Sequence, residues 1–219
     1  MKNRIVLLGP PATGKGTQAA LLSAAFGLPA ASTGAMLRTE KTRGSEAGRE
    51  AEKWTDHGLL VPDELALRIV WQWLGKRTRF LLDGFPRTLG QAESFDAGLE
   101  KRGLPLDAVY LLDLSEDAIR GRMVSRLTCP ACGAVYNESF HRITGESPCP
   151  ACGATLSRRS DDTNEALDRR MAQYREQTLP VAGHYQKKGL LKQVDASPGR
   201  EAVFNALYED LQVETLADV

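Results

Sequence analysis

The stretch GPPATGKGT at residues 9–17 constrains the fold of this chain more than any other. It follows the apolar run RIVLLG at 4–9, which predicts a buried strand, and it leads into TQAALLSAAFG at 17–27, which is helical in composition. Gly9, Gly14 and Lys15 match the pattern G-x-x-x-x-G-K. In such a loop, backbone N–H groups surround phosphate oxygens, while the helix N-terminus and the lysine add positive charge. The sequence therefore predicts a phosphate-binding loop between a strand and a helix.

The residue after the lysine departs from the usual form of this loop. The strict pattern places Ser or Thr directly after the lysine, where its hydroxyl binds Mg²⁺. Here Gly16 comes first and Thr17 follows. The shift argues against the metal-ligating arrangement of most nucleotide hydrolases with this loop.

Short apolar runs alternate with helical stretches along most of the chain, which predicts an α/β fold with a parallel sheet. Further strands are expected at 79–85, 108–115 and 190–197. Helices are expected at 63–76, 89–103, 115–127, 164–188 and 197–211. In folds of this class, ligands bind beyond the carboxyl ends of the strands.

Two stretches interrupt the alternation and are expected to be insertions. Residues 32–62 are polar and helical, with glycines at 34, 44, 48 and 58. Residues 127–163 are rich in Gly, Pro, Cys, Ser and Asp. Each stretch lies between core elements, so neither is expected to form a separate sequential domain.

The second stretch contains a duplicated cysteine motif. CPACGA occurs at 129–134 and again at 149–154, and the two copies hold all four cysteines, Cys129, Cys132, Cys149 and Cys152. This spacing is typical of a tetrathiolate zinc site, in which four thiolates leave no position open for water. The metal is therefore expected to be structural. A redox-active cysteine pair is disfavoured by the second copy, whereas a nucleic-acid-binding zinc ribbon has the same spacing.

Composition and charge limit the classes of protein to which the chain can belong. The chain has 219 residues with 28 basic and 28 acidic side chains, a balance that disfavours a general nucleic-acid-binding surface but allows a local basic cleft. The N-terminal apolar run ends at Gly9-Pro10-Pro11, too early for a signal peptide, and no stretch approaches the roughly 18 apolar residues of a membrane span. We expect a cytoplasmic protein that binds neither membrane nor nucleic acid, with cysteines bound to metal rather than joined as disulfides.

Five ordered motifs resemble those of the adenylate kinase family. They are GKGTQ at 14–18, STGAMLR at 32–38, GLLVPDE at 58–64, FLLDGFPRTLGQAE at 80–93 and DDTNEALDRRM at 161–171. The chain is most similar to the long-lid, zinc-bearing type. The resemblance implies a five-stranded parallel sheet flanked by helices, in a core formed by 1–31, 63–125 and 164–219. It also implies an insertion at 32–62 that binds the nucleoside monophosphate and a zinc-stapled lid at 126–163.

The resemblance further implies the reaction ATP + AMP = 2 ADP with Mg²⁺, and a role for each matching residue. The residues expected to bind ATP are Gly9, Gly14, Lys15, Gly16, Thr17, Arg122 and Arg126. Those expected to bind AMP are Thr33, Arg38, Val61, Gly84, Arg87, Gln91, Arg159 and Arg170. The catalytic residues implied are Lys15, Asp83, Arg87, Arg126, Arg159 and Arg170, with Asp83 holding Mg²⁺ through its water shell. Family spacing selects Arg159 over its neighbour Arg158, and Arg170 over Arg169.

Elementary chemistry agrees with this assignment. Phosphoryl transfer depends on positioning and charge neutralisation, for which guanidinium groups are well suited. The acceptor phosphate is largely dianionic at neutral pH, so no general base is required, and the sequence offers no obvious one.

The chain departs from the family pattern at a few positions. Ala12 replaces a loop glycine, Ala35 replaces an aspartate beside the acceptor pocket, and Ser125 and Leu127 flank Arg126 where Gly and Arg are common. Two alternative functions stay open. One is a kinase for another nucleoside monophosphate, and the other is an ATP-binding protein whose zinc ribbon binds nucleic acid. No feature of the sequence demands an interface between subunits, so we expect a monomer.

Overall fold

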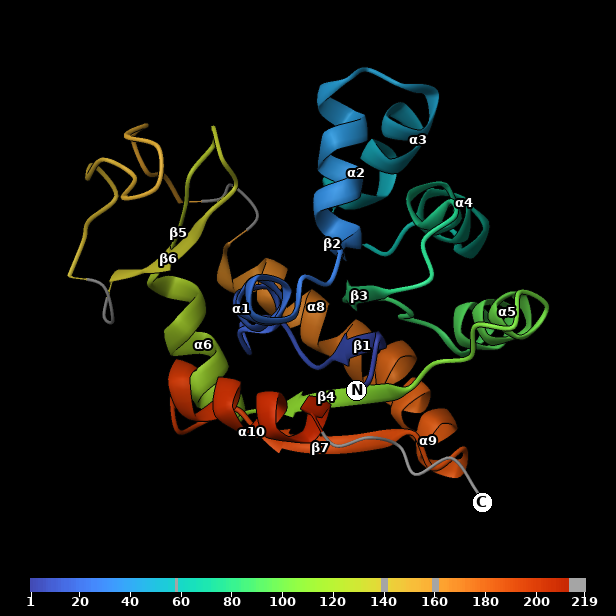
Figure 1. Ribbon diagram of the computed structural model, residues 1–219. Coiled ribbons are helices and arrows are strands. Elements are labelled where there is room, and N and C mark those ends of the chain that lie inside the picture. The colour runs from blue at the N-terminus through green and yellow to red at the C-terminus, as the bar shows by residue number, and fades with distance from the viewer. Residues whose placement is uncertain (58, 139–141, 159–161, 213–219) are drawn as a thin grey trace.

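A five-stranded parallel sheet forms the centre of the computed structural model, which describes residues 1–57, 59–138, 142–158 and 162–212. The strands are β1 (Arg4–Leu8), β2 (Ala30–Ser32), β3 (Phe80–Asp83), β4 (Ala108–Asp113) and β7 (Leu191–Asp195). Their order across the sheet is β2-β3-β1-β4-β7, so β1 is central (Figure 1). The predicted α/β class and parallel sheet are confirmed.

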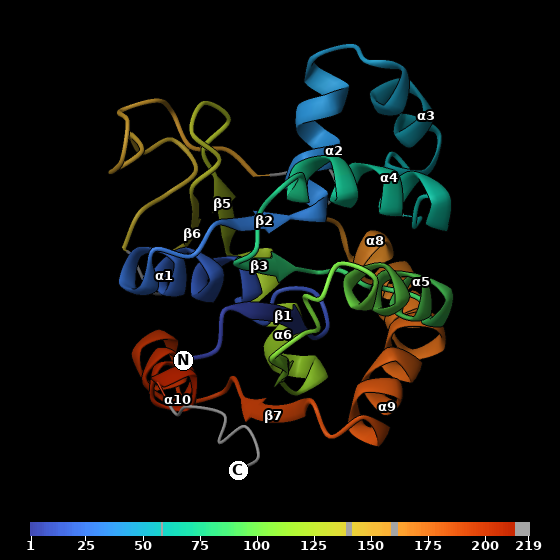
Figure 2. The same ribbon diagram turned by 45° about the vertical axis from the view of Figure 1, so that its right-hand side comes forward.

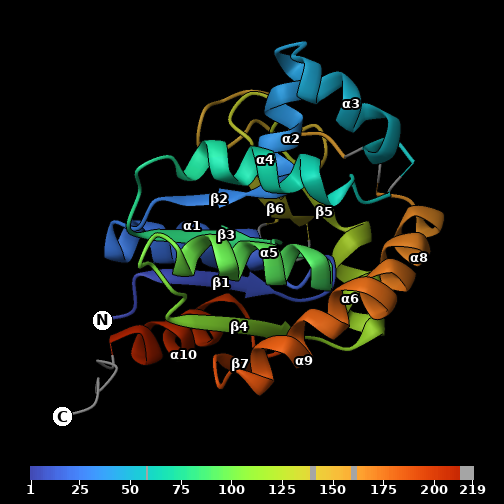
Figure 3. The same ribbon diagram turned by 90° about the vertical axis from the view of Figure 1, so that its right-hand side faces the viewer.

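The central strands are apolar because helices cover both faces of the sheet. The helices are α1 (Lys15–Phe26), α4 (Asp63–Leu74), α5 (Leu89–Glu100), α6 (Glu116–Val124), α8 (Asn164–Gln173), α9 (Leu179–Lys187) and α10 (Arg200–Gln212). Alternate residues of β1 point to opposite sides: Val6 and Leu8 pack toward α4, α5 and α9, whereas Ile5 and Leu7 pack toward α1, α6 and α10. Figure 3 shows α4, α5 and α9 along one face. Among the described residues, no helix is both long and apolar enough to cross a membrane.

The strand register brings several chain segments to one edge. Leu7 is paired with Asp83, and Ser32 is also paired with Asp83, so β1, β2 and β3 end side by side. The loop after β1, the segment after β3 and the start of the 32–62 stretch therefore all leave the sheet at its carboxyl edge. Parallel sheets of this kind place their ligand site at that edge.

Two further groups of elements rise on the same side of that edge (Figures 1 and 2). One contains α2 (Thr33–Thr42) and α3 (Glu46–Thr55); the other contains the antiparallel pair β5 (Arg126–Thr128) and β6 (Val135–Asn137). The contact between α2 and α3 is very close, because a Cβ at Gly48 would lie 2.2 Å from the carbonyl oxygen of Glu40. Only glycine allows that approach.

Local details differ from the sequence prediction at several points. The helix expected at 115–127 ends at Val124, and Arg126–Thr128 form β5 instead. The edge strand β2 was not predicted, because it has three half-exposed residues and no apolar run. The single helix expected at 164–188 is divided into α8, a π-helical turn η1 (Tyr174–Thr178) and α9. Pro180 supplies no backbone N–H to the preceding turn, which accounts for the interruption of the regular hydrogen-bond pattern.

Candidate active site

The loop between β1 and α1 has the backbone geometry that the glycine pattern predicts. Gly9 has φ +140°, and a Cβ there would lie 2.4 Å from the carbonyl oxygen of Leu112 on β4. Gly14 has φ +95° and caps α1 at its N-terminus. Both residues therefore occupy conformations that disfavour any side chain. Gly16 and Thr17 lie in the first turn of α1, where backbone N–H groups have no intrahelical acceptor.

Ala12 is an exception within this loop. Its φ is +60°, in the left-handed region, although it carries a Cβ. This conformation costs a non-glycine residue roughly 1–2 kcal/mol. The backbone bend that family members make with glycine is therefore kept here at a cost in strain.

Lys15 lies folded over the loop that precedes it. Its Nζ donates to the carbonyl oxygens of Gly9 at 2.9 Å and Pro10 at 2.7 Å. Burial lowers the pKa of Lys15 to about 8, with further lowering by the charges of Arg87 and Arg126 and an opposing effect from Asp83. These charges act on one ammonium group because the side chains converge at the carboxyl edge of the sheet.

Asp83 ends β3 directly beside the start of α1. A Cβ on Gly16 would lie 3.3 Å from Asp83 Oδ2, so the carboxylate approaches the helix backbone where a side chain would crowd it. Burial raises the pKa of Asp83 above its usual range, and the charges of Lys15 and Arg87 oppose the rise. A carboxylate at this position can hold a divalent cation through ordered waters.

The segment after β3 presents Arg87 to the same space. Arg87 Nε donates to the carbonyl oxygen of Gly84 at 2.7 Å, and burial lowers the pKa of Arg87, as do the charges of Arg170 and Arg38. Thr33 Oγ1 donates to the Gly84 carbonyl at 2.8 Å and so joins the start of α2 to this segment. The structure therefore brings Thr33, Arg38, Gly84 and Arg87 together.

A second group of arginines lies near the lid. Arg126 Nε donates to Asp162 Oδ2 at 2.7 Å, and Arg126 also donates to Asp162 Oδ1. Arg170 lies 3.7 Å from the same carboxylate, whose side chain is only 3% exposed. Asp162 thus holds two of the predicted arginines side by side. Asp162 is not among the predicted site residues, because no sequence pattern distinguishes it from the aspartate that precedes it.

Three other arginines bear on the predicted assignments. Arg159 lies outside the described residues, so its place in the site stays a prediction. Its neighbour Arg158 donates to the carbonyl oxygen of Val124, at the end of α6, and to Glu138 in the lid, so its guanidinium is paired with protein groups. Arg122 donates to the Ala196 carbonyl at 2.8 Å and links α6 to the segment after β7, near the phosphate loop.

The predicted base-binding residues lie at the beginning of α4 and α5. Val61 is buried, and Gln91 is 2% exposed. Both amide atoms of Gln91 have protein partners, Asp63 and the backbone N–H of Arg87. A pocket opens beside this network, and Asp63 and Thr88 are in its wall. Its lining is Trp54, Leu59, Leu60, Val61, Pro62, Asp63, Thr88, Gln173 and Gln177.

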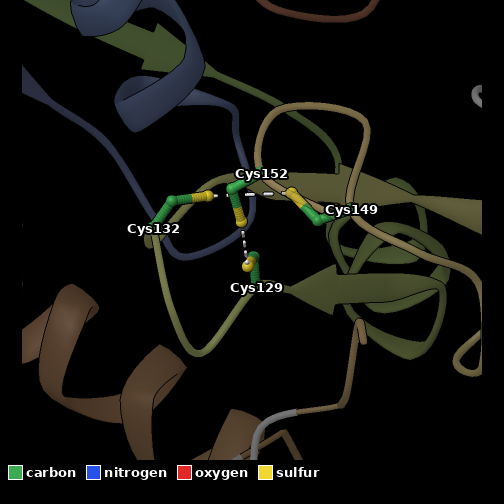
Figure 4. A group of neighbouring side chains, drawn as sticks. All are labelled: Cys129, Cys132, Cys149 and Cys152. Atoms are coloured by element: carbon green, nitrogen blue, oxygen red, sulfur yellow. Dashed lines mark hydrogen bonds between the residues drawn. The ribbon is translucent and has the colours of Figure 1, made fainter. Parts of the chain in front are cut away.

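The four cysteines converge in the lid (Figure 4). Their sulfur atoms all lie within 4.8 Å of one another, with Cys129 and Cys152 3.4 Å apart. Corners of a zinc–thiolate tetrahedron are separated by about 3.8 Å, given Zn–S bonds of about 2.3 Å. The two copies of the motif also fold alike: the Gly133 N–H donates to the backbone carbonyl of Cys129, and the Gly153 N–H donates to that of Cys149. The donor set and geometry fit a four-coordinate soft metal ion.

Among the described residues of the lid, the buried core is small. The buried side chains of this cluster are Leu127, Cys129, Cys149 and Leu156. The Tyr136 hydroxyl lies 3.4 Å from Cys149 Sγ and lowers the pKa of Cys149 to about 6. A thiol that ionises readily is suited to metal binding.

The site as a whole combines a phosphate loop with a second set of cations that extends onto a helical segment. That arrangement defines a P-loop phosphotransferase, in which one anionic substrate lies on the loop and another faces it. Comparison with known proteins specifies the family. The adenylate kinase model matches residues 7–190, and the chain belongs to the adenylate kinase family.

Curated relatives match over nearly their whole length. An adenylate kinase of Moorella thermoacetica is 42% identical over 207 residues, which cover 93% of this chain and 95% of the relative. One of Thermodesulfovibrio yellowstonii is 40% identical, covering 93% and 96%. One of Caldanaerobacter subterraneus is 40% identical over 218 residues, covering 98% and 97%.

Proposed function

We propose that this chain catalyses the reversible, Mg²⁺-dependent reaction ATP + AMP = 2 ADP. One observation carries the proposal: Lys15 lies against the phosphate loop at the carboxyl edge of the sheet, within the electrostatic reach of Asp83, Arg87 and Arg126. Such a cluster of cations holds two polyphosphate chains against their mutual repulsion. Membership of the adenylate kinase family supports adenine nucleotides as the substrates.

On the donor side, ATP lies along the phosphate loop. The first turn of α1, at Lys15, Gly16 and Thr17, directs N–H groups at the phosphates, and the Lys15 ammonium replaces its carbonyl contacts with phosphate oxygens. The glycines Gly9 and Gly14 let the backbone approach closely. Arg122 lies against the same loop, and we assign it to the donor nucleotide.

On the acceptor side, Arg38 and Arg87 hold the phosphate of AMP. That phosphate attacks the γ-phosphorus of ATP: a new P–O bond forms, and the bond to the bridging oxygen of ADP breaks. Arg126, Arg159 and Arg170 neutralise charge on the transferred group. For this, the ion pair between Arg126 and Asp162 must first break. Thr33, Val61, Gly84 and Gln91 line the remainder of the acceptor site.

Two metal ions belong to this proposal. Asp83 would hold Mg²⁺ through ordered waters, and the cation would lower the charge of the polyphosphate. Cys129, Cys132, Cys149 and Cys152 would hold Zn²⁺, since their sulfurs lie at suitable distances. Four protein ligands would leave no open position on this second ion, so its role would be structural.

We infer that residues 32–62 and 126–163 close over the substrates, whereas 1–31, 63–125 and 164–219 form the core. Closure excludes water, which would otherwise accept the phosphoryl group from ATP. We further expect a monomer in the cytoplasm. No specific observation favours the nucleic-acid-binding alternative.

An acceptor-panel assay tests the proposal. With ATP as donor, AMP should be phosphorylated in preference to GMP, UMP and CMP. Preference for another monophosphate would remove only the adenylate assignment, whereas no transfer to any nucleotide would remove the kinase function. Arg87→Ala should lower kcat by roughly 10²–10³, the cost of removing one preorganised charge. Arg43→Ala is the control, because Arg43 is an exposed arginine outside the predicted site residues that pairs only with Glu40 among the described residues.

A further inference from the structure

A partly buried hydrogen-bond network connects the starts of α4 and α5. Asp63 accepts from Thr88 Oγ1 through Oδ2 and from Gln91 Nε2 through Oδ1, both at 2.8 Å. Gln91 Oε1 in turn accepts from the backbone N–H of Arg87 at 2.8 Å. The approach of the two helices is close, since a Cβ on Gly90 would lie 3.1 Å from Asp63 Oδ2.

This network fixes which end of the Gln91 amide is oxygen and which is nitrogen. The Arg87 backbone can only donate, so the amide atom facing it must be the oxygen. Asp63, as a carboxylate, can only accept, so the amide atom facing it must be the nitrogen. A flip of the amide would place donor against donor at Arg87 and acceptor against acceptor at Asp63.

The amide keeps capacity for a ligand. Each amide has two N–H groups and two lone pairs, and the network uses one of each. Among the described residues, the second N–H and the second lone pair of Gln91 have no protein partner. Gln91 therefore offers one donor and one acceptor in positions that cannot be exchanged.

We propose that Asp63 is a positioning residue that makes the acceptor site select a 6-aminopurine over a 6-oxopurine. The inference rests on the proposed function, in which Gln91 contacts the acceptor base. Adenine presents an acceptor at N1 and a donor at its 6-amino group, complementary to a fixed N–H and a fixed carbonyl. Hypoxanthine and guanine present the reverse, a donor at N1–H and an acceptor at O6.

Discrimination then depends on the cost of turning the amide. A 6-oxopurine either meets like groups on Gln91 or forces the flip, and both outcomes leave buried polar groups unmatched. The Arg87 backbone N–H fixes one end of the Gln91 amide, and a side-chain substitution cannot remove it. Asp63 fixes the other end. Its replacement by a residue that both donates and accepts should relax selectivity by about tenfold, the factor for one unmet buried hydrogen bond.

The experiment compares AMP with IMP as acceptors for the full-length enzyme. Asp63→Asn keeps the size of the side chain, but its amide can turn to satisfy either orientation of Gln91. We expect the ratio of kcat/KM for IMP to that for AMP to rise about tenfold, mainly through KM. Asp63→Glu stays an acceptor only and should keep the wild-type ratio, even if both KM values rise.

Asp117→Asn is the matched control, since Asp117 is also an acidic residue in the first turn of a helix. It should leave the ratio unchanged. An unchanged ratio in Asp63→Asn, with both acceptors weakened equally, would overturn the inference and make Asp63 a purely structural residue. If circular dichroism finds that variant unfolded, Asp63→Ser applies the same test. Failure of the wild-type enzyme to phosphorylate AMP would instead overturn the proposed function.

Discussion

Replacing Gly9 by alanine tests whether the phosphate loop is held by the sheet beneath it. The added Cβ would lie 2.4 Å from the carbonyl oxygen of Leu112, a backbone atom on β4. The φ of Gly9, +140°, is also one that residues with a side chain rarely adopt. Gly103→Ala is a matched control, since Gly103 has φ +65° but nothing within 4 Å of an added Cβ.

The two substitutions differ by one energetic effect. Both incur backbone strain, roughly 1–2 kcal/mol. Gly9→Ala must also displace the Leu112 carbonyl or the loop, an overpacking cost of about 1–3 kcal/mol. The free energy of unfolding should therefore fall by about 2–5 kcal/mol in Gly9→Ala, against about 1–2 kcal/mol in Gly103→Ala.

Chemical denaturation followed by circular dichroism measures this difference, and each kcal/mol should lower Tm by about 2–4 °C for a chain of this size. Gly9→Ala should in addition lower kcat/KM for ATP, because the loop backbone that binds phosphate has moved. Gly103→Ala should keep wild-type kinetics. Equal destabilisation by both variants would refute the argument that contact with β4 determines the loop position.

Three further predictions concern charge and metal. Because the pKa of Lys15 is about 8, the free enzyme loses this charge above that pH, so KM for ATP should rise in alkaline buffer. Lys15→Arg should flatten the dependence of KM on pH. The same pH dependence in wild type and variant would contradict the role of Lys15 in binding ATP. Removal of metal by a chelator should lower Tm, and a metal analysis well below one ion per chain would contradict the structural site. Burial opposes ionisation of Asp210, but hydrogen bonds from Lys192, Lys2 and Tyr110 outweigh it and lower its pKa to about 2. Its contribution to stability should be complete above pH about 4 and lost as pH falls toward about 2, so Asp210→Asn should lower Tm at pH 6 and cease to matter near pH 2.

The parts of the fold that follow from sequence are those set by periodicity and by glycine. The run at 4–9 predicts β1 because a strand covered on both faces must be apolar throughout, and Gly9 and Gly14 predict a bend that only glycine makes readily. The edge strand β2 has neither signal. Its three residues are defined by pairing with β3, a contact between segments about 50 residues apart.

The site is predicted to the extent that its residues form local motifs. Lys15, Asp83 and Arg87 lie in such motifs, and the structure brings them together. The role proposed for Asp63 depends on partners 25 and 28 residues away, and the hold of Asp162 on Arg126 spans 36 residues. No periodicity or spacing marks such contacts, because they arise only when two helices meet or when the strand that begins the lid meets the segment before α8.

The two ends of the described chain are tied to each other. Lys2 N–H donates to the Leu211 carbonyl at 3.2 Å, and Lys2 Nζ lies 2.6 Å from Asp210, so the segment leading into β1 is strapped to the last helix. During synthesis, β1 emerges first, yet its neighbour β4, the edge strand β7 and the helix α10 follow about 100 to 200 residues later. At roughly 5–20 residues per second, the ribosome takes on the order of 10–40 s to release that helix. The strand that carries the phosphate loop is thus made well before the elements that enclose it, so its apolar face stays exposed on the nascent chain and open to aggregation in that interval.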